Sequence, residues 1–144
     1  MNFSVDANLL LYAVNQDAVH HVRAKGFIEE KARSSETWIF PWQVAHAFLR
    51  ISTHSGILPH PLALAQAVLV LERFLGLSHV RFVAEGERFW EYYKTAVLTG
   101  HIRGGAISDA LIAAILKEQG VSTLFSADRD FLKFKGLRVI NPLE

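Results

Sequence analysis

The sequence predicts an α/β fold of three layers, in which helices cover both faces of a mainly parallel sheet. Two observations support this expectation. Short runs rich in apolar and β-branched residues alternate with longer segments whose apolar residues recur at helical spacing. Those helical segments are long enough to connect parallel strands, and a parallel sheet needs cover on both of its faces.

The length and composition suit one domain over residues 1–144. The chain is 51% hydrophobic and 20% charged, which is enough for a real core. It has no cysteine, which excludes disulfide scaffolds, zinc–thiolate sites and cysteine nucleophiles. Its net charge of +1 excludes a strongly basic nucleic-acid-binding surface but not a local basic patch. No apolar run reaches the roughly 20 residues of a membrane span and no signal peptide is evident, so we expect a cytoplasmic protein without membrane contact.

Two strands and four helices are expected in the first half of the chain. A short apolar strand spans residues 2–6 and ends at Asp6, after which Ala7 begins a helix. Pro41 suits the first turn of a helix, and Gly76 suits the residue that stops one. The other elements expected here are a helix over 18–33, a strand over 37–40, and helices over 41–53 and 61–75.

Three strands and two helices are expected in the second half. Glycines 100, 104 and 105 mark a tight or flexible loop. Ser108 is expected to N-cap a helix that starts at Asp109, and Gly120 to end that helix. The expected strands span 79–83, 122–126 and 137–140, and the expected helices span 85–98 and 109–119.

Four of the five aspartates occupy positions where an α/β fold places functional side chains. Asp6 ends the first strand, Asp109 opens a helix, and Asp128 and Asp130 follow the fourth strand. Ligands bind at the carboxyl ends of the strands in such folds. Each acid also has a local explanation, namely a helix cap for Asp6, the helix dipole for Asp109, a turn for Asp128 and a helix start for Asp130.

A cluster of these carboxylates would favour a bound cation. Like charges a few ångströms apart do not all ionise without cost, so a cluster implies raised pKa values or a metal ion. Mg²⁺ and Mn²⁺ prefer oxygen-only ligands of this kind and organise phosphoryl chemistry. An aspartyl phosphotransferase acting through Asp6 is disfavoured, because Asn8 stands where its second acid would be.

Three motifs together resemble the PIN-domain ribonucleases, and most closely the VapC toxins of bacterial type II toxin–antitoxin systems. They are the segments 5–10 (VDANLL), 108–114 (SDALIAA) and 124–131 (LFSADRDF). The likeness continues through 137–143 (LRVINPL), so it covers almost the whole chain in the expected order. Each motif alone is weakly specific, whereas the ordered set is strongly specific.

The resemblance implies a metal-dependent endoribonuclease whose acids lie at the strand ends. Asp6 and Asp109 would hold the Mg²⁺ or Mn²⁺. Both Asp128 and Asp130 fall within the family's last acidic motif, and Asp130 is favoured as part of the site with Asp128 close behind.

The resemblance also implies neighbouring polar groups and partners. Asn8 and Ser126 match polar positions beside the acids, where they would orient carboxylates, waters or the RNA substrate. A homodimer and a cognate VapB antitoxin, which masks the active-site groove, are implied as well.

One position departs from the family's pattern. The family carries a glutamate in the helix after the second strand, in a context like Pro-Trp-x-x-x-x-Glu-Phe-Leu-Arg, and Ala47 takes its place here. Either the natural chain lacks this acid and is weakened, or the alanine is an engineered change that disarms a toxic nuclease; the intact surrounding motif favours the engineered change. The alternative function is a catalytically dead PIN-fold module that binds RNA or a partner.

Holding RNA requires cations near the acids, because carboxylates repel phosphates unless a metal reverses the field. Arg50 lies on nearly the same helix face as position 47, and would contact a phosphate or form a surface ion pair. His46 points to another face, so a ligand role for it is not expected. Trp42 and the other aromatics are expected in the core. The remaining basic candidates are His101, Arg103, Arg129, Lys133 and Lys135.

Overall fold

The computed structural model describes residues 2–100 and 102–144, and these residues form a parallel five-stranded sheet. The strands lie in the order β3-β2-β1-β4-β5, and every neighbouring pair is parallel. Because β1 is central, its carboxyl end lies between those of β2 and β4. The strands are β1 (Asn2–Val5), β2 (Thr37–Pro41), β3 (Val80–Val83), β4 (Thr123–Phe125) and β5 (Arg138–Ile140).

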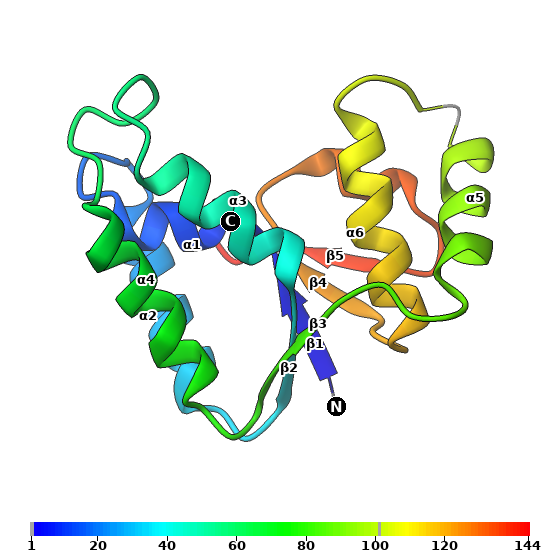
Figure 1. The fold of residues 1–144 in the computed structure, drawn as a ribbon, viewed down its shortest axis with the longest axis horizontal. Coiled ribbons are helices and arrows are strands. Elements are labelled where there is room, and N and C mark those ends of the chain that lie inside the picture. Colours follow the sequence, from blue (N-terminus) through cyan, green and yellow to red (C-terminus); the bar gives the residue numbers. More distant parts are fainter. Residues whose placement is uncertain (1, 101) are drawn as a thin grey trace.

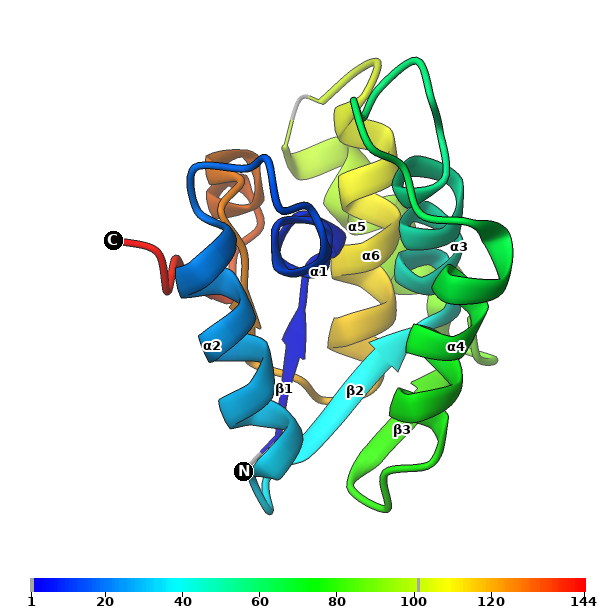
Figure 2. The ribbon, with the colours of Figure 1, turned by 90° about the vertical axis from the view of Figure 1, so that its left-hand side faces the viewer.

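Helices flank this sheet on both sides, which confirms the predicted three-layer α/β/α architecture. In Figure 1, α1, α2 and α4 lie on the left, α5 and α6 on the right, and α3 crosses the middle. Figure 2 shows β1 and β2 running upward together, β1 toward α1 and β2 toward the α3 side. The helices are α1 (Ala7–Val14), α2 (His21–Arg33), α3 (Trp42–Ser52), α4 (Leu64–Leu75), α5 (Phe89–Thr99) and α6 (Ala106–Glu118), with a 3₁₀ helix η1 (Arg129–Lys133).

The central strands are buried as a parallel sheet requires. In β2, the side chains of Trp38, Ile39 and Phe40 are all buried, which is the continuous apolar pattern of a strand covered on both faces. Phe3 of β1 packs on Trp38 with ring centroids 5.5 Å apart. Within the described residues, none of the helices is long and apolar enough to cross a membrane.

Two helices begin elsewhere than the sequence predicted. The last long helix starts at Ala106 with Gly105 as its N-cap, so Ser108 is not the cap and Asp109 lies within the first turn. Gly104 has a φ of +63°, and this turn lets the helix start earlier than Ser108 implied. The helix expected over 85–98 starts only at Phe89, because Glu118 accepts hydrogen bonds from two backbone N–H groups of the preceding loop.

Two further helices also start later than predicted. The helices expected from residues 18 and 61 start at His21 and Leu64. Pro41 belongs to the end of β2 and precedes α3 rather than starting it. Gly76 ends α4 as predicted, and Gly120 follows α6 with a φ of +73°, a conformation that favours glycine.

Candidate active site

A cavity of about 510 Å³ opens where the carboxyl end of β1 meets α3 and α6. Its volume lies in the range of small-ligand sites in proteins. Two of the predicted acids, Asp6 and Asp109, line it from one side, and predicted Arg50 and Ala47 line it from α3. The other lining residues are Ala7, Trp42, Gln43, Val44, His46, Ser108, Leu111, Ile112 and Phe131.

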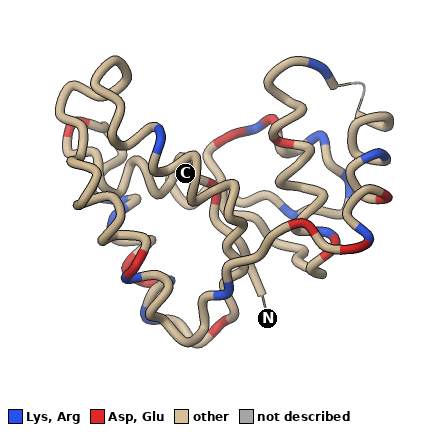
Figure 3. Tube along the Cα trace, viewed as in Figure 1, with Lys and Arg blue, Asp and Glu red and all other residues tan. Residues whose placement is uncertain are grey.

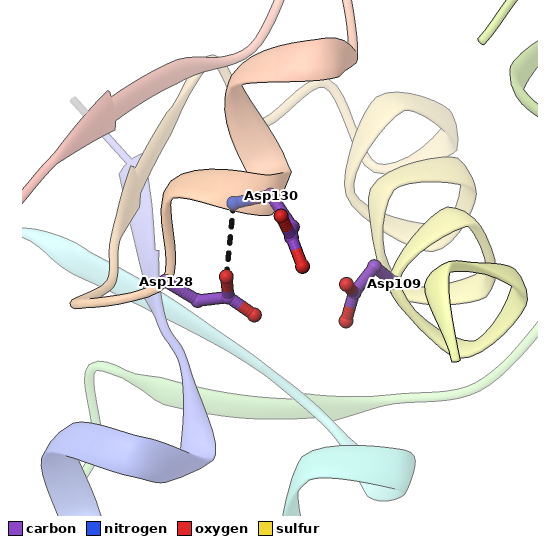
Figure 4. A group of neighbouring side chains, drawn as sticks. All are labelled: Asp109, Asp128 and Asp130. Atoms are coloured by element: carbon purple, nitrogen blue, oxygen red, sulfur yellow. Dashed lines mark hydrogen bonds between the residues drawn. The ribbon is translucent and has the colours of Figure 1, made fainter. Parts of the chain in front are cut away.

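Three of the predicted acids form a tight carboxylate group beside this cavity. Asp109, Asp128 and Asp130 each offer an oxygen, and these oxygens all lie within 4.8 Å of one another. Figure 4 shows Asp109 on α6 facing the two other carboxylates, of which Asp128 precedes η1 as its N-cap and Asp130 lies in the first turn of η1. The backbone N–H of Asp130 donates to Asp128 Oδ1 at 2.9 Å, which fixes the loop that carries both acids.

Asp6 lies next to the carboxylate group but is not a member of it. It lines the same cavity as Asp109, and both of its oxygens accept hydrogen bonds. Asp6 Oδ1 accepts from the Ala7 backbone N–H at 2.8 Å, as an N-cap of α1. Asp6 Oδ2 accepts from Ser126 Oγ at 2.7 Å.

Ser126 connects Asp6 to the acidic loop. Its hydroxyl donates to Asp6 and accepts from the backbone N–H of Asp128 at 2.9 Å. Ser126 is 1% exposed, so these bonds are protected from water. Asn8 makes a longer contact with the same loop, where its Oδ1 accepts from the Ala127 N–H at 3.5 Å. Both side chains therefore lie beside the acids, where the sequence predicted them.

Two acids of the site hold protons more strongly than usual. Burial raises the pKa of Asp6, although the hydrogen bonds from Ser126 and the Ala7 backbone oppose that rise. Burial raises the pKa of Asp109 to about 6, and repulsion from Asp128 adds to this effect. Such shifts are typical of functional sites, and a cation placed among the acids would relieve the repulsion.

The opposite wall of the cavity comes from α3 and carries no acid. Trp42, His46 and Arg50 recur at intervals of four residues, and all three line the cavity and are exposed. Ala47, at the position where the resemblance implied a glutamate, also lines the cavity and is half-buried. His46 and Ala47 thus both line the cavity, although the sequence predicted that they lie on different faces of the helix.

The basic candidates differ in their availability. Among the ion pairs of the described residues none involves Arg50, so the predicted surface pair is not formed there. Arg129 pairs with Glu144 at 3.7 Å, and Lys133 with Asp130 at 4.0 Å. Arg103 and Lys135 are exposed, and His101 lies outside the described residues. Figure 3 shows acidic and basic residues spread over both halves of the chain.

Sequence reasoning missed three contributors to the cavity. Trp42 was expected in the core, yet it is 47% exposed at the mouth of the cavity. Gln43 lines the cavity and donates through Nε2 to Glu85, and Phe131 of η1 also lines it. The four-residue spacing of Trp42, His46 and Arg50 is the signal that could have found this wall.

The donor set fits a hard divalent cation. The three clustered side chains offer only carboxylate oxygens, which suit Mg²⁺ and Mn²⁺ better than softer metals. The pKa of Asp109 is raised to about 6 by burial and by repulsion from the neighbouring acids, although Lys133 opposes the rise, and a bound cation would lower it. The arrangement can therefore hold a metal ion next to a cavity that admits a ligand.

Comparison with known proteins gives the same family throughout. The model of the PIN domain family matches residues 4–137. Ribonuclease VapC48 of Mycobacterium tuberculosis is 34% identical over 142 residues, covering 99% of this chain and 98% of the relative. Ribonuclease VapC43 of the same species is 30% identical over 140 residues, covering 97% and 95%.

Solved structures show the same fold. A VapBC2 structure from Rickettsia felis, bound to a promoter DNA fragment, matches with a TM-score of 0.69 at 20% identity, covering 98% of each chain. The M. tuberculosis toxin VapC20, which cleaves the sarcin–ricin loop, matches with a TM-score of 0.67 at 18% identity, covering 94% of this chain and 98% of that one. From the family match, the full-length relatives and the acidic site together, the chain belongs to the PIN-domain family and to its VapC ribonucleases.

Proposed function

We propose that this chain is the toxin of a type II toxin–antitoxin system and acts as an Mg²⁺- or Mn²⁺-dependent endoribonuclease. The observation that carries the proposal is the group of three carboxylates within 4.8 Å of one another at the edge of a ligand-sized cavity. The proposal is also supported by a relative of nearly the same length and 34% identity, which is named a ribonuclease.

In this proposal the metal would be held by Asp6, Asp109, Asp128 and Asp130, of which the last three offer oxygens within 4.8 Å of one another. A bound divalent cation supplies positive charge that neutralises the scissile phosphate and the leaving oxygen and acidifies a water. Water oxygen bonds to phosphorus and the P–O3′ bond breaks, which leaves a 5′-phosphate and a 3′-hydroxyl. Cleavage requires no covalent enzyme intermediate, so the aspartates act by charge and position.

The remaining residues of the site position these acids and the RNA. Ser126 holds Asp6 and the acidic loop through two hydrogen bonds, and Asn8 supports the same loop. Arg50 faces the cavity from the acid-free wall, where it would contact an RNA phosphate. One phosphodiester would thus lie between a metal at the acidic wall and Arg50 on the α3 wall.

The second candidate function is a PIN-fold module that binds RNA or a partner without cutting. Ala47 favours it, because a carboxylate is missing from the cavity wall that faces Asp6 and Asp109. We propose that the alanine weakens metal binding and slows cleavage. An alanine codon at position 47 in the native gene would refute the hypothesis that it is engineered.

Incubation of the purified chain with a 5′-labelled structured RNA tests both functions. We expect cleavage with Mg²⁺ or Mn²⁺, none with EDTA, and products bearing 5′-phosphates. Asp130→Asn should lose activity, whereas Asp17→Asn serves as the matched control, because Asp17 pairs with His60 away from the cavity. RNA binding without turnover would favour the module, and a phosphorylated protein intermediate would favour a transferase.

A VapB-type antitoxin is the proposed protein partner, since the structural neighbours include VapBC complexes. We also propose a homodimer, and a cytoplasmic location where RNA substrates are present. Coexpression with the product of a short neighbouring gene, followed by light scattering of the purified complex, would test the partner and the stoichiometry. A toxin that stays monomeric and uncomplexed would contradict both.

A further inference from the structure

One aromatic side chain at the cavity has no structural reason to be exposed. Of the three tryptophans, Trp38 is 0% exposed in the core and Trp90 is 62% exposed on α5. Trp42 is 47% exposed, and it alone of the three lines the cavity that also contains Asp6 and Asp109. Trp42 is therefore partly open to solvent and borders the acidic site.

Packing fixes the orientation of this indole. Its ring lies 4.7 Å from that of Phe82 on β3, at an angle of 47°. Phe82 in turn stacks on Phe40 of β2 at 4.4 Å and 13°. Trp42 is also the first residue of α3, so its backbone is part of the helix. A ligand that contacts Trp42 would therefore meet a preformed surface and would order little of the protein on binding.

From this geometry we propose that Trp42 is the stacking platform for one unpaired base of the RNA substrate, next to the scissile phosphate. The inference rests on the proposed ribonuclease function and adds a residue that selects the substrate. Aromatic side chains bind unpaired bases through their flat faces, and a base within a duplex cannot offer its face in this way. The platform would thus restrict cleavage to unpaired nucleotides.

The surroundings of Trp42 favour a nucleotide over an apolar peptide segment. Arg50 lies two helical turns farther along the same stripe of α3 and lines the same cavity. The stripe therefore presents a flat aromatic surface at one end and a cation at the other, which suits a base and a phosphate. The carboxylates across the cavity would hold a cation, whose positive charge would favour a phosphate at the same place.

Binding of a labelled single-stranded RNA of about 12 nucleotides tests the platform. Fluorescence anisotropy would be measured with Ca²⁺ in place of Mg²⁺. Ca²⁺ would neutralise the carboxylates of the cavity, while the conditions disfavour cleavage of the RNA. We expect Trp42→Leu to weaken binding about tenfold or more, since an aromatic stack is lost while apolar volume is kept. Trp42→Phe should retain part of the affinity, and Trp90→Leu should bind like the unmodified chain.

A second measurement needs no change at Trp42. In a Trp90→Phe variant the emission comes from buried Trp38 and from Trp42, so quenching by the single-stranded RNA reports on Trp42. We expect quenching by the single strand and much less by the same strand annealed to its complement. This readout also holds if Trp42→Leu fails to fold.

The outcomes separate this inference from the proposed function. If the unmodified chain binds and cleaves RNA while Trp42→Leu binds equally well and no quenching occurs, the platform is wrong and the ribonuclease stands. If the unmodified chain neither binds nor cleaves RNA with any of these cations, the proposed function itself fails. Loss of antitoxin binding in Trp42→Leu, with RNA binding unchanged, would overturn the inference in favour of a protein contact.

Discussion

The two walls of the cavity have opposite characters. On one side Asp109, with Asp128 and Asp130 close by, concentrates negative charge, and the pKa of Asp109 is raised to about 6. On the other side α3 presents Trp42, Arg50 and Ala47 and carries no acid. In the proposed function the acidic wall would hold the metal and the α3 wall would hold the RNA, and Ala47 stands where the resemblance implied a further acid.

Removing an acid from the carboxylate wall should have the largest effect. Asp109→Asn keeps the size of the side chain but removes a charge from the group, so cleavage should fall by about 100-fold or more. A gel assay of labelled RNA with Mg²⁺ measures this, with Asp17→Asn as control. Equal rates for Asp109→Asn and the unmodified chain would mean that this wall does not hold the catalytic metal.

Placing an acid at position 47 should reduce the difference in charge between the two walls. Ala47→Glu adds a carboxylate that faces Asp6 and Asp109 across the cavity, so it should raise metal affinity and the cleavage rate by about tenfold. Ala47→Gln controls for size without charge and should give no gain. An unchanged rate in Ala47→Glu with saturating Mg²⁺ would show that position 47 has no such role.

Acid pH should weaken the metal-binding wall. Because the pKa of Asp109 is raised to about 6, this group is protonated below that pH and metal must displace the proton. Calorimetric Mn²⁺ affinity should therefore be constant above pH 7 and fall by up to about tenfold per pH unit below pH 6. Affinity that stays flat between pH 7 and pH 5 would contradict this assignment.

The same raised pKa has a consequence for stability without metal. The unfolded chain releases this proton near pH 4 and the folded chain near pH 6, so the folded state binds more protons between these values. The contribution of Asp109 therefore destabilises the metal-free protein as pH rises from 4 to 6. Asp109→Asn should reduce this decline in thermal midpoint, measured by circular dichroism in EDTA.

On the α3 wall, Arg50→Gln should weaken RNA binding without affecting metal binding. The loss of one phosphate contact lowers the slope of log Kd against log salt by about 0.7 for a single strand, and lowers affinity by roughly fivefold at 0.1 M salt. Exposed Arg81 on β3 provides the control variant Arg81→Gln. An unchanged salt slope in Arg50→Gln would remove this residue from the RNA site.

The smallest expected change concerns the link between Asp6 and the acidic loop. Ser126→Ala removes two buried hydrogen bonds and should cost about 1 kcal/mol or slightly more of unfolding free energy, measured with urea. The pKa of Asp6 should rise further, because the lost bond from Ser126 lowers it. Exposed Ser122→Ala should have little effect, and a similar loss in both variants would argue against this role.

Much of this arrangement could be predicted from the sequence, because local rules and long-range geometry agree there. Apolar runs locate β1 and β2, and the parallel sheet brings the ends of β1 and β4 together, so Asp6 and Asp128 had to be neighbours. The start of α6 was wrong because Ser108 looked like a cap, whereas the backbone turn at Gly104 starts the helix one turn earlier.

The shape of the cavity could not be predicted in the same way. How close the four aspartates lie to one another depends on hydrogen bonds between distant residues. One example is the bond from Ser126 to Asp6, two residues that are 120 positions apart. The exposure of Trp42 depends on how much of its ring Phe82 of β3 covers, and no local sequence pattern encodes this contact. Spacing can suggest a shared helix face, but tertiary packing decides whether that face is buried.

The central position of β1 gives the order in which the site is completed during translation. Asp6 precedes Ser126 by 120 positions, yet its backbone N–H bonds to the Phe125 carbonyl at 2.9 Å and its side chain to Ser126. These contacts must wait until β4 and the residues after it have emerged from the ribosome. A nascent chain that stops before β4 therefore carries Asp6 without Asp128 and Asp130, and the acids come together only after this later segment has been made.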